Sequence, residues 1–142
     1  MGNQLEFRWL GVGGFELRTP QATLLVDPFL TRPPLRKLFF GRTRPDGALL
    51  RQHIQDADFI LVSHAHYDHL LDVAEIAGYT GARVYGSANT CRILAACGLE
   101  AEQVVRVRAG EALVLNPDPS IGKGEEIGTR DVPISSEGRG GF

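Results

Sequence analysis

A short apolar run followed directly by a histidine cluster constrains this chain more than any other feature of its sequence. Residues 59–62 read FILV, and the next seven, SHAHYDH, contain three of the four histidines. A continuously apolar run of this length is typical of a strand buried on both faces. A segment with helical spacing, LLDVAEIA (70–77), comes next. We therefore expect a strand, loop and helix, with the histidines just past the C-terminal end of the strand.

The segments around this unit predict a layered α/β fold. We expect the helix over 70–77 to stop at Gly78, and a second helix to begin after Ser87 as N-cap and end at Gly98. The further expected strands are residues 5–11, 14–20, 22–28, 82–86, 104–108 and 111–115. The last two of these strands, joined at Ala109-Gly110, are typical of a hairpin.

Two segments do not follow the strand and helix pattern. Residues 29–57 contain three prolines, six basic residues and the pair Phe39 and Phe40. Such a long loop is either a lid over an anionic or lipid-like substrate, or a surface loop whose phenylalanines pack into the core. Residues 116–142 are rich in Gly, Pro and Ser without apolar periodicity, which predicts an irregular tail after a domain at 1–115.

Composition and charge exclude several classes of protein. A chain of 142 residues is expected to form one domain, and its net charge of −2 does not favour nucleic-acid binding. No apolar run approaches the roughly 18 residues of a membrane span. Cys91 and Cys97 match no metal or redox pair, so we expect reduced thiols. A cytoplasmic protein is the resulting expectation.

The side chains of the histidine cluster are those that bind transition metals. Imidazole and carboxylate suit Zn²⁺, and also Mn²⁺ or Fe. His64 and His66, two apart in an extended segment, can share one metal, while Asp68 and His69 can face a second. Paired metals lie about 3.5–4 Å apart and lower the pKa of a bound water to roughly 7, which yields a hydroxide nucleophile. A lone histidine such as His53 is more simply a packed or surface residue.

The stretch SHAHYDHLLD resembles the H-x-H-x-D-H motif of the metallo-β-lactamase superfamily, and LLVDPF precedes it in the expected order. The resemblance is closest to the branch of ascorbate-6-phosphate lactonase and N-acyl phosphatidylethanolamine phospholipase D. It implies the N-terminal half of an αββα sandwich, with a mixed sheet, helices on one face and an incomplete second half. The implied activity is a metal-dependent hydrolase that uses a metal-bound hydroxide on an ester, lactone, amide or phosphodiester bond.

The resemblance also implies roles for individual residues. His64 and His66 would bind the first metal, and Asp68 and His69 the second. Asp68 would in addition be catalytic, by steering the hydroxide and carrying its proton. Asp27 would be a structural carboxylate near the site, or alternatively only the end of a strand.

The chain departs from the family pattern after the motif. The family implies two later histidines and a bridging aspartate, but no histidine follows His69, and the later aspartates are Asp72, Asp118 and Asp131. Three interpretations follow: a fragment or frame-shifted product, a half-domain completed by a homodimer that covers an exposed sheet, or a non-catalytic metal-binding or interaction module. We expect weak metal binding and little activity from these 142 residues.

Overall fold

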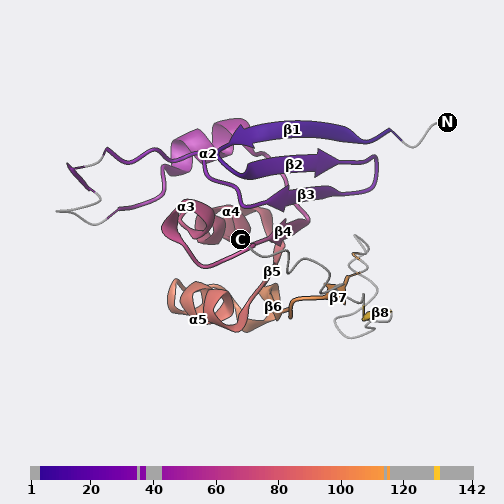
Figure 1. Ribbon diagram of the computed structural model, residues 1–142. Coiled ribbons are helices and arrows are strands. Elements are labelled where there is room, and N and C mark those ends of the chain that lie inside the picture. The colour runs from indigo at the N-terminus through magenta and orange to yellow at the C-terminus, as the bar shows by residue number, and fades with distance from the viewer. Residues whose placement is uncertain (1–3, 35, 38–42, 114, 116–129, 132–142) are drawn as a thin grey trace, which may run out of the picture.

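Six strands form one mixed sheet, in which their order across the sheet is their order along the chain (Figure 1). The computed structural model describes residues 4–34, 36–37, 43–113, 115 and 130–131. The strands of this sheet are β1 (Glu6–Gly11), β2 (Gly14–Arg18), β3 (Thr23–Val26), β4 (Phe59–Leu61), β5 (Arg83–Gly86) and β6 (Val104–Arg106).

The direction of the strands brings several strand ends to one edge of the sheet. β1, β2 and β3 pair antiparallel, whereas β3, β4, β5 and β6 pair parallel. The C-terminal ends of β3, β4 and β5 therefore lie at the same edge, together with the turn that joins β1 to β2. In open sheets with parallel strands this is the edge at which ligands bind.

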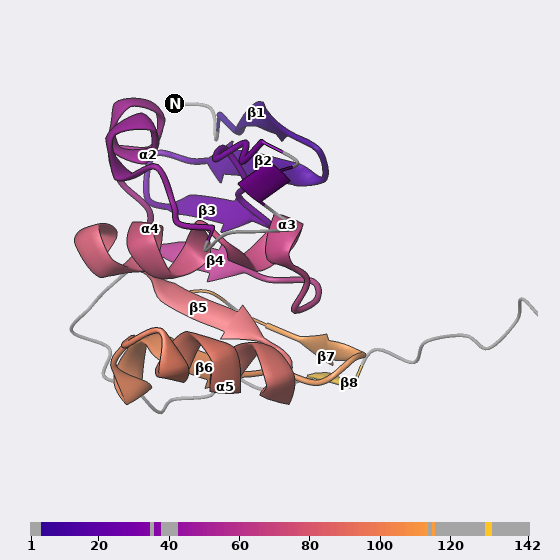
Figure 2. The same ribbon diagram turned by 90° about the vertical axis from the view of Figure 1, so that its left-hand side faces the viewer.

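Helices pack against one face of the sheet, as Figure 2 shows for α2, α4 and α5. The helical segments are α2 (Gly47–His53), α3 (Tyr67–Leu70), α4 (Val73–Thr80), α5 (Ala88–Ala96) and the 3-10 turn η1 (Ala101–Gln103). The core lies between this helical layer and the sheet. Its fully buried members include Leu25, Leu50, Ile60, Ile76, Val84 and Leu94. The expected α/β fold with a mixed sheet and helices on one face is confirmed.

The opposite face of the sheet is also apolar. Trp9 pairs with Phe15, which pairs with Val26, so these three side chains share that face. On β1, Phe7 is 63% exposed and Trp9 is 68% exposed. No described helix covers this face. Among the described residues, this apolar face is therefore exposed along β1, and the expectation of an incomplete second half stays a prediction.

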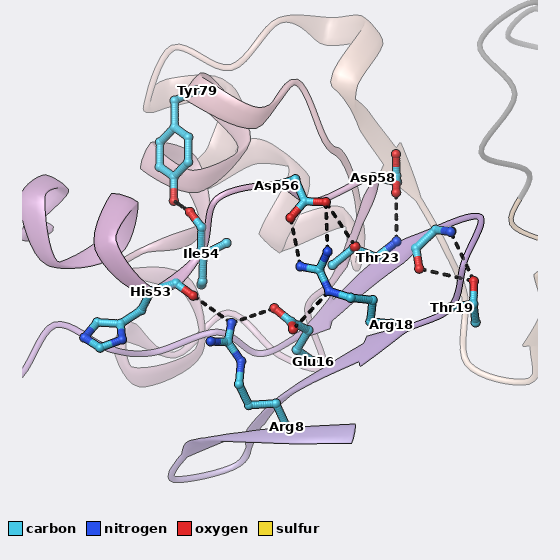
Figure 3. A network of polar contacts seen from close by, with 11 residues as sticks. Arg8, Glu16, Arg18, Thr19, Thr23, His53, Ile54, Asp56, Asp58 and Tyr79 are labelled. Atoms are coloured by element: carbon cyan, nitrogen blue, oxygen red, sulfur yellow. Dashed lines mark hydrogen bonds and ion pairs between the residues drawn. The ribbon is translucent and has the colours of Figure 1, made fainter. Parts of the chain in front are cut away.

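A polar network fastens β1 and β2 to the segment after α2 (Figure 3). Glu16 is buried between Arg8, at 2.7 Å, and Arg18, at 3.6 Å. Arg18 also pairs with Asp56 at 2.8 Å, and this hydrogen bond holds the pKa of Asp56 below its usual value. Arg8 donates to the backbone carbonyl of His53 at 2.7 Å. The network orients the N-terminal strands without contributing to the edge where the histidines lie.

The structure corrects two predicted boundaries. The helix expected to stop at Gly78 continues as α4 to Thr80, because Gly81, with φ of 76°, provides the left-handed C-cap. The loop expected over 29–57 contains α2, whose N-cap Asp46 accepts a hydrogen bond from the backbone N–H of Leu49. The phenylalanine pair of that segment, Phe39 and Phe40, lies outside the described residues. The N-cap at Ser87 is confirmed, since its side chain accepts from Thr90 N–H at 3.3 Å.

The hairpin predicted from residues 104–108 and 111–115 is wrong. β6 pairs parallel with β5, while β7 (Glu111–Ala112) pairs antiparallel with β8 (Arg130–Asp131) in a separate ribbon. The parallel pairing places Val104 beside Val84 and so extends the apolar core. Across the described ranges, no helix is long and apolar enough to cross a membrane.

Candidate metal centre

The histidine motif begins where β4 ends. Val62 donates its backbone N–H to Tyr85 on β5 at 2.9 Å, so the chain leaves the sheet only after that residue. His66 has an extended backbone and is the N-cap of α3. Asp68 and His69 consequently lie in the short helix α3, directed back toward the strand end.

Three of the four predicted ligands converge. His64, Asp68 and His69 each offer a ligand atom, and these atoms all lie within 4.8 Å of one another. The imidazole centroids of His64 and His69 are 3.9 Å apart, and Asp68 Oδ2 lies 3.5 Å from His69 Nε2. His66 is outside this group of three but packs edge-on against His64, with ring centroids 4.4 Å apart. The assignment of all four as metal ligands stays a prediction.

Asp27 lies directly behind this cluster. Its carboxylate accepts the backbone N–H of Ser63 at 2.7 Å and the Ser63 hydroxyl at 2.6 Å. The same carboxylate approaches His69 Nδ1 to 3.0 Å. This buried nitrogen has no hydrogen bond among the described residues, so it is close to the Asp27 carboxylate but not aligned with it for a hydrogen bond. Asp27 is therefore part of the site, and the alternative that it only ends a strand does not account for these contacts.

The hydrogen bonds of Ser63 determine which nitrogen of His64 carries the proton. Ser63 gives its single hydroxyl proton to Asp27, and its oxygen lies 2.8 Å from His64 Nδ1. That nitrogen must then be the donor, because a hydroxyl has only one proton to give. The Nε2 lone pair of His64 is left free, as a metal ligand requires.

Gly14 lets the turn between β1 and β2 approach Asp27 closely. A Cβ on Gly14 would lie 2.5 Å from the carbonyl oxygen of Asp27, whereas one on Gly13 would lie 3.5 Å from His69 Cε1, an ordinary van der Waals distance. Asp27 itself has a positive φ of 43°, a conformation that aspartate tolerates better than most residues. Close backbone approach thus explains the glycine-rich turn.

The site residues that sequence reasoning did not assign are Ser63 and the glycines of this turn. Ser63 immediately precedes the first histidine, and only its contact with Asp27, 36 positions earlier, shows its role. The glycines stand at and between the ends of two expected strands, residues 5–11 and 14–20. Their second role depends on the packing of β1 and β2 beside β3.

The donor set fits a transition metal. It combines two imidazoles with a carboxylate in one group, and the third imidazole, of His66, touches His64. A carboxylate that faces the far nitrogen of a histidine, as Asp27 faces His69 Nδ1, is a common support for a metal-binding imidazole. Fold and site together define an α/β protein with a candidate metal centre at the C-terminal edge of its sheet.

The chain belongs to the family described as the β-lactamase superfamily domain, whose sequence pattern matches residues 22–125, within the metallo-β-lactamase superfamily. Among similar proteins, a UPF0173 metal-dependent hydrolase of Ruegeria sp. (strain TM1040) is 41% identical over 78 residues, which cover 55% of this chain and 30% of that protein. A UPF0173 metal-dependent hydrolase of Anaeromyxobacter sp. (strain K) is 30% identical over 134 residues, which cover 94% of this chain and 43% of that protein.

The fold is also found in a solved structure. A metallo hydrolase from the archaeon Ignicoccus hospitalis superposes with a TM-score of 0.55 at 21% identity, over 76% of this chain and 42% of that one. The chain spans between 30% and 43% of the length of these three proteins. The family match continues past Leu115 to residue 125. The narrower resemblance to the lactonase and phospholipase branch stays a prediction.

Proposed function

We propose that this chain binds one or two metal ions at His64, His66, Asp68 and His69 and carries part of the active site of a metal-dependent hydrolase. The observation that supports this most is the convergence of three donor side chains within 4.8 Å of one another. Two proteins similar to this chain have names that describe them as metal-dependent hydrolases. Zn²⁺ is the proposed metal, with Mn²⁺ or Fe as alternatives.

A metal bound there would supply Lewis acidity and lower the pKa of a bound water. The other residues of the site hold the ligand side chains in place and orient them. Ser63 keeps the proton of His64 on Nδ1, so the Nε2 atom of His64 remains available, and the Asp27 carboxylate faces Nδ1 of His69 at 3.0 Å. Asp68 is the proposed catalytic residue, because its carboxylate lies beside these imidazoles and can accept a proton from an attacking water. The substrate would be a small molecule with an ester, lactone, amide or phosphodiester bond.

Metal content tests the ligand assignment. Purified wild-type chain and a His64→Ala/His66→Ala variant are loaded with Zn²⁺, desalted and analysed for bound metal. We expect the wild type to retain metal and the variant to lose most of it. His53→Ala is the matched control, because His53 is exposed and its only described contact uses the backbone carbonyl. Equal metal in all three proteins would overturn the assignment.

A second candidate is a metal-binding or interaction module without catalysis. It is favoured by the small donor set: within the described part of the chain, the cluster holds three convergent ligands. Turnover of bis-p-nitrophenyl phosphate and of p-nitrophenyl acetate separates the two functions. Turnover lost in Asp68→Ala indicates an enzyme, whereas metal retention without turnover indicates the module.

We also propose that a second copy of this chain covers the apolar sheet face. The residues that share this face on the first three strands, Phe7, Trp9, Phe15, Leu17, Leu24 and Val26, are uncharged. A symmetric dimer through this face would place uncharged side chains against their own copies. Sedimentation equilibrium of the wild type and of Trp9→Arg tests this, and a monomeric wild type at high concentration would contradict it. A cytoplasmic location and a domain boundary near Leu115 remain predictions.

A further inference from the structure

Arg32 lies on the segment that follows β3, three positions after Phe29. Its guanidinium carbon is 5.1 Å from the ring centroid of Phe29, so the two side chains form a cation–π pair. A Cβ on Gly11 would collide with the Arg32 guanidinium. Arg32 therefore lies over the first residue of the turn that joins β1 to β2.

Two contacts fasten this segment to the histidine motif. The buried carboxylate of Asp72 accepts the backbone N–H groups of Leu30 and Thr31 at 2.7 and 2.8 Å. Phe29 in turn packs edge-on against Tyr67, with ring centroids 6.0 Å apart. Tyr67 stands between His66 and Asp68 in the sequence and is 54% exposed. Arg32 is thus attached to the motif through one buried aromatic ring and one buried acid.

The charge of Arg32 has no acidic partner among the residues that the structure describes. Other arginines in this half of the sheet are paired: Arg8 with Glu16, and Arg18 with Asp56. Arg32 is exposed and has only its contacts with Phe29 and the glycine turn. A guanidinium stacked on a ring keeps its N–H donors directed outward in its own plane, which suits a carboxylate or phosphate.

An exposed guanidinium without an acidic partner among the described residues is available to bind an anion. We propose that Arg32 binds an anionic group of the substrate, a carboxylate or phosphate, while the exposed ring of Tyr67 contacts the adjoining part of the molecule. This proposal rests on the proposed function, which it deepens by naming the substrate class: anionic small molecules rather than neutral ones.

Binding of phenylphosphonate, measured by titration calorimetry on both the Zn²⁺-loaded and the metal-free chain, tests this proposal. We expect Arg32→Gln to weaken binding roughly tenfold or more, as the loss of charged hydrogen bonds does, and Arg32→Lys to weaken it less. Arg92→Gln, which removes an exposed charge from α5, is the matched control and should bind like the wild type. Benzamide, a neutral probe of similar shape, should show no dependence on Arg32.

The outcomes separate this proposal from the proposed function. Metal content that is unchanged in Arg32→Gln, together with weaker phosphonate binding, supports both. Phosphonate binding that depends on Arg32 in a chain that takes up no metal supports the Arg32 site and refutes the metal centre. Phosphonate binding that is absent, or equally strong in wild type and Arg32→Gln, in both forms of the chain overturns the Arg32 proposal.

Discussion

The carboxylate of Asp27 accepts two hydrogen bonds from Ser63, at 2.7 Å from the backbone N–H and 2.6 Å from the hydroxyl. This contact joins the ends of two parallel neighbours, β3 and β4, directly behind the histidine cluster. It fixes the start of the loop that carries His64 and His66, and it fixes the tautomer of His64 through the Ser63 oxygen.

Removing this support should weaken metal binding without unfolding the protein. For Asp27→Asn and for Ser63→Ala we expect Zn²⁺ affinity to fall roughly 10- to 100-fold, the usual effect of losing a residue that orients a metal ligand. Asparagine tolerates the positive φ at position 27, so Asp27→Asn mainly removes the charge. Competition with a chromophoric chelator measures the affinity.

Ser87→Ala is the matched control for Ser63→Ala. Ser87 caps α5 at the same edge of the sheet but makes no described contact with the cluster. Its loss should cost about 1 kcal/mol of folding free energy and leave Zn²⁺ affinity unchanged. If both serine variants bound Zn²⁺ as tightly as the wild type, the role assigned to Ser63 would be wrong.

Gly14→Ala should destabilise the fold. The new Cβ would lie 2.5 Å from the carbonyl oxygen of Asp27, and neither backbone can move away without disturbing β2 or β3. We expect a loss of about 1–3 kcal/mol in urea unfolding, the range for overpacking. Gly78→Ala is the control: it lies in α4 with nothing within 4 Å of the added atom, and should gain about 0.5–1 kcal/mol. Equal stability of both variants would contradict the close approach.

The Arg18–Asp56 pair should stabilise the protein at neutral pH and lose its effect in acid. The Arg18 hydrogen bond lowers the pKa of Asp56, so the folded protein holds the ionised form in preference to the unfolded chain. The stabilisation is complete above the ordinary pKa of aspartate and is lost as the pH falls through the lowered one. Because the Asp56 side chain is 61% exposed, we expect at most about 1 kcal/mol.

Thermal unfolding of wild type and Asp56→Asn between pH 7 and pH 2.5 checks this. The difference in Tm should be largest at pH 7 and should shrink toward the acid end. Glu100→Gln, which changes an exposed acid ahead of η1, serves as the control. A difference that grew on acidification would have the wrong sign.

Tyr79→Phe should cost about 1 kcal/mol, because the phenol donates to the carbonyl of Ile54 at 2.7 Å and holds α4 against the end of α2. Burial raises the pKa of Tyr79. Its protonated form therefore stabilises the fold fully below the ordinary pKa of tyrosine, and this is lost as the pH rises through the raised value. Urea unfolding at pH 7 and absorbance titration at 295 nm measure the two effects. A variant as stable as the wild type would contradict the assigned hydrogen bond.

Local patterns in the sequence were sufficient for strands β1 to β6, for helices α4 and α5, and for three of the residues in the cluster. An apolar run of four specifies a buried strand because its side chains alternate between two dry faces. Ser87 specifies a helix start because its hydroxyl replaces a missing backbone acceptor. His64, Asp68 and His69 lie within six positions of the sequence. The loop after β4 and the single turn of α3 therefore bring them together. These properties depend on near neighbours in the chain.

Tertiary structure decided the pairings that span long stretches of sequence. β6 joins β5 rather than the adjacent β7, because the parallel pairing buries apolar residues that a local hairpin would leave in water. In the same way, only the alignment of β3 beside β4 brings Asp27 to Ser63 and His69, and only tertiary packing places Arg32 against Gly11. Residue types indicate which chemistry is available, whereas contacts between distant segments determine which side chains share a site.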